Sequence, residues 1–156
     1  MLIFFRTYSK TVQQYFCLGY SGTVTRNKLI STINKFGPQY SVVFDVIVNS
    51  AGKGWSSIIR FTSTDNNCCN HGDRVPAVFY NSDGFLYITS SVNDIGNYGF
   101  TYDIDLKKWY HIEIVQANKN GKVKNIIITI SYSEYLLLDL LHYQYQWCCG
   151  KECGQH

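Results

Sequence analysis

The sequence lacks the features that mark several common functional classes. Only 16% of its 156 residues are charged, which argues against a disordered tail or a long exposed helix. The formal net charge is +3, and the basic residues are scattered rather than gathered into the stripe that nucleic-acid binding needs. The longest apolar run, residues 135–141, is too short for a bilayer and contains Asp139, so membrane insertion is not expected.

Catalytic signatures are also missing. Glycan hydrolysis generally uses a pair of carboxylates, but Glu113, Glu134 and Glu152 stand outside any paired motif. No carboxylate lies two residues from Glu113 on its expected strand. His111 has no serine or cysteine nucleophile beside it in a recognisable motif, so a structural or solvent-exposed role is favoured. The sequence therefore predicts a protein without enzymatic activity.

The cysteines are the main indication of the cellular compartment. Their even number in a strand-rich chain favours disulfides or free thiols, and an extracellular or secretory location. No signal peptide is seen, since the apolar residues 1–5 are too few and end at Arg6. Zinc is disfavoured although Cys68, Cys69 and His71 lie together, because Cys-x-x-Cys spacing is absent. The sequence leaves two disulfide pairings open. One is a bridge from the Cys68–Cys69 loop to the rest of the chain, and the other is a bridge within the tail. The six cysteines are Cys17, Cys68, Cys69, Cys148, Cys149 and Cys153.

Alternation of apolar residues predicts an all-β chain. Aromatic residues make up 16% of the sequence, and short alternating segments are separated by polar turns, which is typical of a sandwich. Tyr40, Val42 and Phe44 share one face of a strand that we expect to be central, because its other face is also largely apolar. Gly84 ends a hairpin turn at residues 81–84. The expected strands are residues 40–48, 55–61, 75–80, 85–90, 100–104, 109–116 and 123–132.

Three segments carry a resemblance to a known family. They are Tyr-Ser-Val-Val-Phe-Asp-Val at residues 40–46, Gly-Phe-Leu-Tyr-Ile at 84–88 and Trp-Tyr-His-Ile-Glu-Ile at 109–114. Over residues 29–130 the chain resembles the laminin-G-like, concanavalin A-like jelly-roll superfamily. This resemblance implies two packed antiparallel sheets that bind glycans, glycosaminoglycans or proteins at a rim or on the concave face, often with Ca²⁺. The chain lacks the family's usual final strand after Ile130. It also lacks the Glu-x-Asp-x-x-Glu strand of the hydrolytic relatives.

These observations divide the chain into three parts. Residues 1–28 are expected to be an N-terminal extension or an edge strand, and residues 29–133 the antiparallel two-sheet jelly-roll sandwich. Residues 134–156 form a cysteine-containing C-terminal tail, where periodicity does not separate strand from helix.

Two polar segments, residues 62–74 and 92–99, are expected to be loops that form the binding rim. A loop as long as the first one is often functional in a compact domain. Oxygen ligands on Asp65, Asp73 and Asp94 would suit Ca²⁺ if the loops converged. The favoured interpretation is that such residues bond their own backbone in turns, so no cofactor is expected apart from this Ca²⁺ option. The candidate ligand-binding residues are Asp65, Asn67, His71, Asp73, Arg74, Asp94, Asn97 and Tyr98.

The sequence thus favours a non-enzymatic extracellular recognition module that binds a glycan through its rim loops. Exposed aromatic side chains such as Tyr98, Tyr102 or Trp55 could stack on the apolar faces of sugar rings, while most aromatic residues fill the core. The alternative is an adhesion or assembly module that binds an extracellular protein and has no sugar site. Long edge strands and a large flat apolar patch would favour this alternative.

Overall fold

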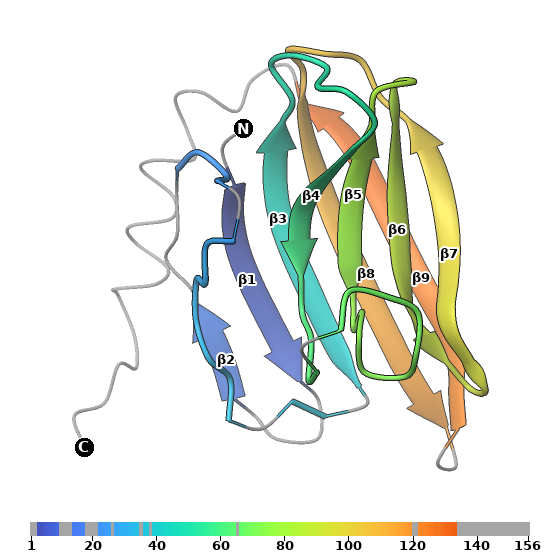
Figure 1. Cartoon of the computed structure of the whole chain (residues 1–156). Helices are drawn as coiled ribbons and strands as arrows, with labels where there is room; N and C mark the ends of the chain where they lie inside the picture. Colours follow the sequence, from blue (N-terminus) through green and yellow to red (C-terminus); the bar gives the residue numbers. More distant parts are fainter. Residues whose placement is uncertain are drawn as a thin grey trace, which may run out of the picture.

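The computed structural model describes residues 3–9, 14–17, 22–25, 27–34, 36–37, 39–64, 66–119 and 122–133. These residues form nine strands and no helix. The strands make two antiparallel sheets that pack face to face, which confirms the expected all-β sandwich class (Figure 1). None of the described residues belongs to a helix with the length and apolarity needed to cross a membrane.

The larger sheet has five strands in the order β2-β1-β3-β8-β9. Its strands are β1 (Ile3–Ser9), β2 (Gln14–Cys17), β3 (Tyr40–Ile47), β8 (Trp109–Lys119) and β9 (Lys122–Ser133). Strand β3 pairs with β1 on one side and β8 on the other, which confirms its predicted central position. The register sets Phe44 opposite Ile112 and Ile112 opposite Ile130, so apolar side chains line up on one face.

The smaller sheet has four strands in the order β4-β5-β6-β7. Its strands are β4 (Trp55–Arg60), β5 (Ala77–Asn81), β6 (Phe85–Val92) and β7 (Ile95–Asp103). The tight turn between β5 and β6 confirms the predicted hairpin, and Gly84 takes a φ of 97° there. The chain passes from one sheet to the other between β3 and β4, and returns between β7 and β8.

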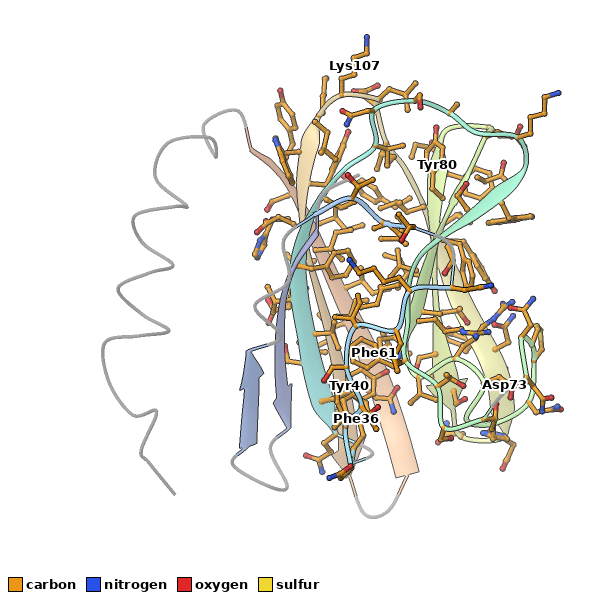
Figure 2. The ribbon with its side chains drawn as sticks, turned by 60° about the vertical axis from the view of Figure 1, so that its left-hand side comes forward. Phe36, Tyr40, Phe61, Asp73, Tyr80 and Lys107 are labelled. Atoms are coloured by element: carbon orange, nitrogen blue, oxygen red, sulfur yellow. A yellow bond between two sulfur atoms is a disulfide. The ribbon has the colours of Figure 1, made fainter. Side chains whose placement is uncertain are left out.

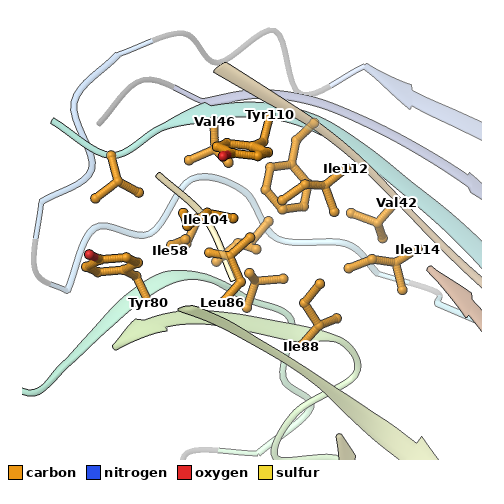
Figure 3. Packing of buried hydrophobic residues seen from close by; sticks show 14 of the residues in the cluster. Val42, Val46, Ile58, Tyr80, Leu86, Ile88, Ile104, Tyr110, Ile112 and Ile114 are labelled. Atoms are coloured by element: carbon orange, nitrogen blue, oxygen red, sulfur yellow. The ribbon is translucent and has the colours of Figure 1, made fainter. Parts of the chain in front are cut away.

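The inner faces of the two sheets enclose one hydrophobic core (Figure 3). Every second residue of β3 and β8 points inward, as the alternation predicts, and Phe44, Ile112 and Ile114 are fully buried. From the four-stranded sheet Leu86 and Ile88 meet them. Tyr80 and Ile104 fill one end of the core.

A buried polar network lies near the other end of the sandwich. The Tyr40 hydroxyl donates to Gln116 Oε1 at 2.8 Å and lies 2.6 Å from Ser90 Oγ, which also donates to Gln116 Oε1 at 2.8 Å. Burial raises the pKa of Tyr40 well above its ordinary value, although the hydrogen bond to Ser90 lowers it. Figure 2 shows Phe36 and Phe61 beside Tyr40, and their rings stack 5.4 Å apart. The network therefore joins β3, β6 and β8 across the two layers.

Three expectations about the strands need correction. Residues 92–99 are not a loop, because β6 continues to Val92 and β7 begins at Ile95, with Asn93 at a φ of 52° in a tight turn. In β4 the register shifts between Ser57 and Ile59, so residues 58 and 59 are both buried instead of alternating. Residues 28–33 alternate as a strand would, with Leu29, Ser31 and Ile33 on one face, but no strand forms there.

The expected parts of the chain map onto the structure as follows. The N-terminal segment, expected as an extension or edge strand, contributes β1 and β2 to the five-stranded sheet, with β2 at its edge. The tail at residues 134–156, with three of the cysteines, lies outside the described residues. The structure brings the sulfur atoms of the adjacent Cys68 and Cys69 together, a pairing that the sequence analysis did not consider.

Candidate functional site

The loop at residues 62–74 is organised around a buried carboxylate. Asp73 is fully buried, accepts a hydrogen bond from Thr64 Oγ1, and accepts a second from the backbone N–H of Asn70 at 2.9 Å. These two bonds hold the pKa of Asp73 below its usual value. The backbone N–H of Ser63 donates to Gly72 O at 2.9 Å and closes the loop. Asp73 therefore stabilises the loop rather than facing a ligand, and Figure 2 shows it away from Tyr40 and Phe36, which lie between the layers.

Arg74 and Asn97 connect this loop to strand β7. The Arg74 guanidinium donates from one terminal N–H to Asn97 Oδ1 at 3.0 Å and from Nε to Asn67 O at 3.1 Å. It also lies over the Phe79 ring, 4.7 Å from the centroid. Nearby, the Gly96 backbone packs against residues 69–71, where a Cβ would overlap the backbone of Cys69. The loop at residues 62–74 thus meets the β6–β7 hairpin, and Arg74 covers part of the outer face of the four-stranded sheet at Phe79.

The remaining predicted site residues are spread apart. His71 and Asn67 are exposed on the loop, and Asp94 is exposed at the turn between β6 and β7. Tyr98 is exposed but lies in β7 opposite Ser90, so it shares the inner face of the sheet. Asp65 lies outside the described residues.

A calcium or zinc site finds little support in this geometry. Asp73 is one of the three carboxylates considered for Ca²⁺, and both of its oxygens accept hydrogen bonds from the protein. In the part of the chain that the structure describes, no three Asp, Glu, His or Cys side chains gather as ligands for a metal ion.

The same outer face carries a group of aromatic side chains, of which Trp55 is the most exposed. Trp55 is 58% exposed, and its ring meets Phe85 and Tyr87 edge to face at centroid distances of 5.7 and 5.8 Å. The register explains this gathering, because Trp55 and Phe85 both pair with Asn81, while Phe79 pairs with Tyr87. We call this group the outer-face aromatic patch; its members are Trp55, Phe79, Phe85 and Tyr87.

Gly99 makes room for one side of the patch. A Cβ at this position would overlap the Tyr87 ring, so only glycine allows that ring to lie across β7. The Tyr87 hydroxyl accepts a hydrogen bond from Asn97 Nδ2 at 3.2 Å, and Thr89 Oγ1 fixes Asn97 by donating to its Oδ1 at 2.8 Å. Exposed hydrogen-bonding side chains border the patch in the same rows of the sheet. They are Ser57, Thr101 and Asp103.

The sequence analysis named Trp55 as a stacking candidate but missed Phe79, Phe85 and Tyr87. A signal was present, because Phe85 and Tyr87 alternate with the core residues Leu86 and Ile88 and must face away from them. What the sequence does not contain is the cross-strand register that brings these residues to Trp55.

The outer face of the five-stranded sheet holds a different group. Asp45 is buried, and its Oδ1 lies 2.7 Å from His111 Nδ1 on the neighbouring strand. Ser131 of β9 follows in the same row. The imidazole is partly exposed while the carboxylate is not, so His111 provides a partner for a carboxylate that would otherwise be costly to bury. This pairing agrees with a structural role for His111.

Comparison with known proteins gives no further guide: no protein-family model, no curated protein and no solved structure matches this chain.

Proposed function

We propose that this chain is a non-enzymatic, extracellular glycan-recognition module of the laminin-G-like jelly-roll type, and that its sugar site is the outer-face aromatic patch. The observation that carries the proposal is Trp55, a large aromatic side chain left 58% exposed at the start of β4 beside two further aromatic rings. The extracellular location rests on the cysteine content alone.

The chemistry of the patch suits a sugar ring. A pyranose has apolar C–H faces and a rim of hydroxyls, so it binds best where aromatic faces adjoin hydrogen-bonding groups. The exposed Ser57, Thr101 and Asp103 side chains supply such groups around the patch. Only one of these three carries a charge, which favours a neutral or basic sugar over a polyanionic glycosaminoglycan.

The rim residues act mainly as positioning groups in this proposal. Arg74 packs on Phe79, and Asn97 holds the Tyr87 hydroxyl, so both shape the patch without being its contact surface. His71 and Asp94 remain exposed, on the loop and at the turn between β6 and β7, and are not part of the proposed contact surface. Binding on the patch requires no metal ion.

A glycan array on the purified chain, run with Ca²⁺ and again with a chelator, tests the proposal. We expect binding to one sugar class that survives chelation and is lost in Trp55→Ala. The matched control is Ile127→Ala, which truncates a similarly exposed side chain on the other sheet and should bind as the wild type does. Binding that needs Ca²⁺, or that persists in Trp55→Ala, would contradict the placement on the patch.

A protein-binding assembly module is the second candidate function. It is favoured by a specific observation, the exposed aromatic side chains Tyr98, Phe100 and Tyr102 on strand β7. A chain that binds no glycan in either array condition would shift the balance to this candidate.

A further inference from the structure

Strand β7 is the last strand of the four-stranded sheet, so one row of its backbone N–H and C=O groups faces away from β6. In the described part of the chain, no backbone–backbone hydrogen bond beyond the sheet ladder involves residues 95–103, although the carbonyls of Tyr98 and Gly96 accept hydrogen bonds from the Thr89 and Ser91 hydroxyls. A sheet edge of this kind is a template for another strand, and soluble proteins usually protect it.

Two of the other three sheet edges carry such protection. Strand β4 is short and interrupted by the register shift after Ser57, and it ends at the charged Arg60. Strand β2 has only four residues. Strand β9 begins with Lys122 and Lys124 but has no charge from Asn125 to Ser133. Strand β7 has nine residues, no proline and no charge before Asp103, so it too is an edge without such protection.

The side chains of β7 are apolar where they are most accessible. Tyr98, Phe100 and Tyr102 are 42%, 39% and 45% exposed, and the first two rings meet edge to face at 5.2 Å. They pair with Ser90, Ile88 and Leu86 of β6, so all three lie on the inner face of the sheet. Within one molecule the core does not cover these three side chains, whereas a neighbouring molecule packed against β7 would cover them.

We propose that this surface binds a second copy of the chain, and that two β7 strands pair antiparallel around a two-fold axis. In such a pairing each residue lies opposite one from the same face of the sheet. The aromatic residues are spaced by two, so a register centred on Phe100 sets Phe100 against its own copy and Tyr98 against Tyr102 of the second copy. No charge occurs between residues 95 and 102, so no like charges oppose each other along this length.

The product is a continuous eight-stranded sheet. A two-fold axis that pairs antiparallel strands is perpendicular to the sheet, so both outer faces look in the same direction. Where the proposed glycan site holds, the dimer presents two aromatic patches to one surface, and multivalent glycans bind with added avidity. The proposed dimer depends on β7 alone, so a failure to bind glycan would not contradict it.

Sedimentation equilibrium of the full chain without glycan, over a wide concentration range, tests the dimer. We expect a reversible dimer, weakened about 100-fold or more in Phe100→Lys, because the lysine places a charge in the aromatic contact. Ile127→Lys makes the same kind of change on β9 and should leave the dimer intact. Tyr102→Lys replaces Phe100→Lys if circular dichroism shows that the latter does not fold.

Amide hydrogen exchange of the wild-type chain provides a second readout. Protection of residues 95–103 should rise with protein concentration while that of β4 stays constant. A chain that is monomeric at every concentration overturns the proposal. So does β7 protection that is independent of concentration, which would indicate that another part of the same chain covers the edge. A dimer broken by Ile127→Lys and not by Phe100→Lys also overturns it.

Discussion

The two outer faces of the sandwich differ in what they expose. The face of the five-stranded sheet buries the Asp45 carboxylate against His111, with polar residues such as Thr129 and Ser131 nearby and one aliphatic side chain, Ile127, that is 55% exposed further along β9. The face of the four-stranded sheet leaves Trp55 open to solvent beside other aromatic rings. Water solvates the polar groups of the first face, while exposing a large aromatic ring beside others on the second face is unfavourable unless something binds to it. Function is therefore expected on the second face.

Removal of His111, the partner of the buried Asp45 carboxylate, should have the largest effect on stability. His111→Ala leaves the buried Asp45 carboxylate without the imidazole, and we expect a loss of about 2–3 kcal/mol in the free energy of unfolding. Chemical denaturation measures the loss, and glycan binding should be unchanged in the folded variant. Reduced affinity for glycan would show that the two faces are not independent.

The addition of one methyl group at Gly99 should displace a ring of the outer-face aromatic patch. Gly99→Ala forces the Tyr87 ring off β7, and we expect a loss of about 1–3 kcal/mol together with loss of glycan binding. The control is Gly52→Ala, where a Cβ meets only ordinary contacts, the nearest being Ser56 Oγ at 3.4 Å. Equal effects of the two substitutions would refute the role given to Gly99.

The buried carboxylate of the loop should make stability depend on pH. The pKa of Asp73 is lower in the folded state than in the unfolded state. The ionised carboxylate therefore stabilises the folded state fully above the unfolded pKa of about 3.9, and this stabilisation is lost as the pH falls through the lower folded pKa. Asp73→Asn should be less stable than the wild type at neutral pH, and this difference should shrink in acid. Thermal unfolding at several pH values measures this difference in stability. A difference that does not change with pH would contradict the stabilising role given to the Asp73 carboxylate.

The smallest change in stability is expected for Trp55, the central residue of the proposed glycan site. Trp55→Ala removes a ring that is mostly exposed, and its cost should stay within about 1 kcal/mol. Its glycan affinity should nevertheless fall below detection. A large loss of stability would mean that Trp55 is part of the core packing rather than a binding group.

Much of the fold could be predicted because the core strands alternate cleanly. Tyr40, Val42 and Phe44 on β3, and Ile112 and Ile114 on β8, show the period of two and point inward as expected. Strand β7 could not be found at its full length, because Asn97 and Gly99 have low strand propensity and serve tertiary contacts instead.

The candidate site was harder to predict than the fold. Asp73 and Arg74 have the residue types of a ligand-binding loop, yet their partners lie within the protein, and only the folded chain reveals those partners. The aromatic patch depends on pairing between strands distant in sequence, such as Trp55 with Asn81. Local patterns contain no information about that register.

The order of the strands also has a consequence for folding. Strands β3 and β8 are neighbours in one sheet, and the backbone N–H of Lys107 donates to Val48 O at 2.8 Å where the chain leaves and returns. The whole four-stranded sheet is thus a single excursion between two adjacent strands. Closing so long a loop costs entropy before the central pair is formed, which slows folding. Because the ends of this excursion meet, its length and loops can change during evolution while the pairing of β3 with β8 is kept.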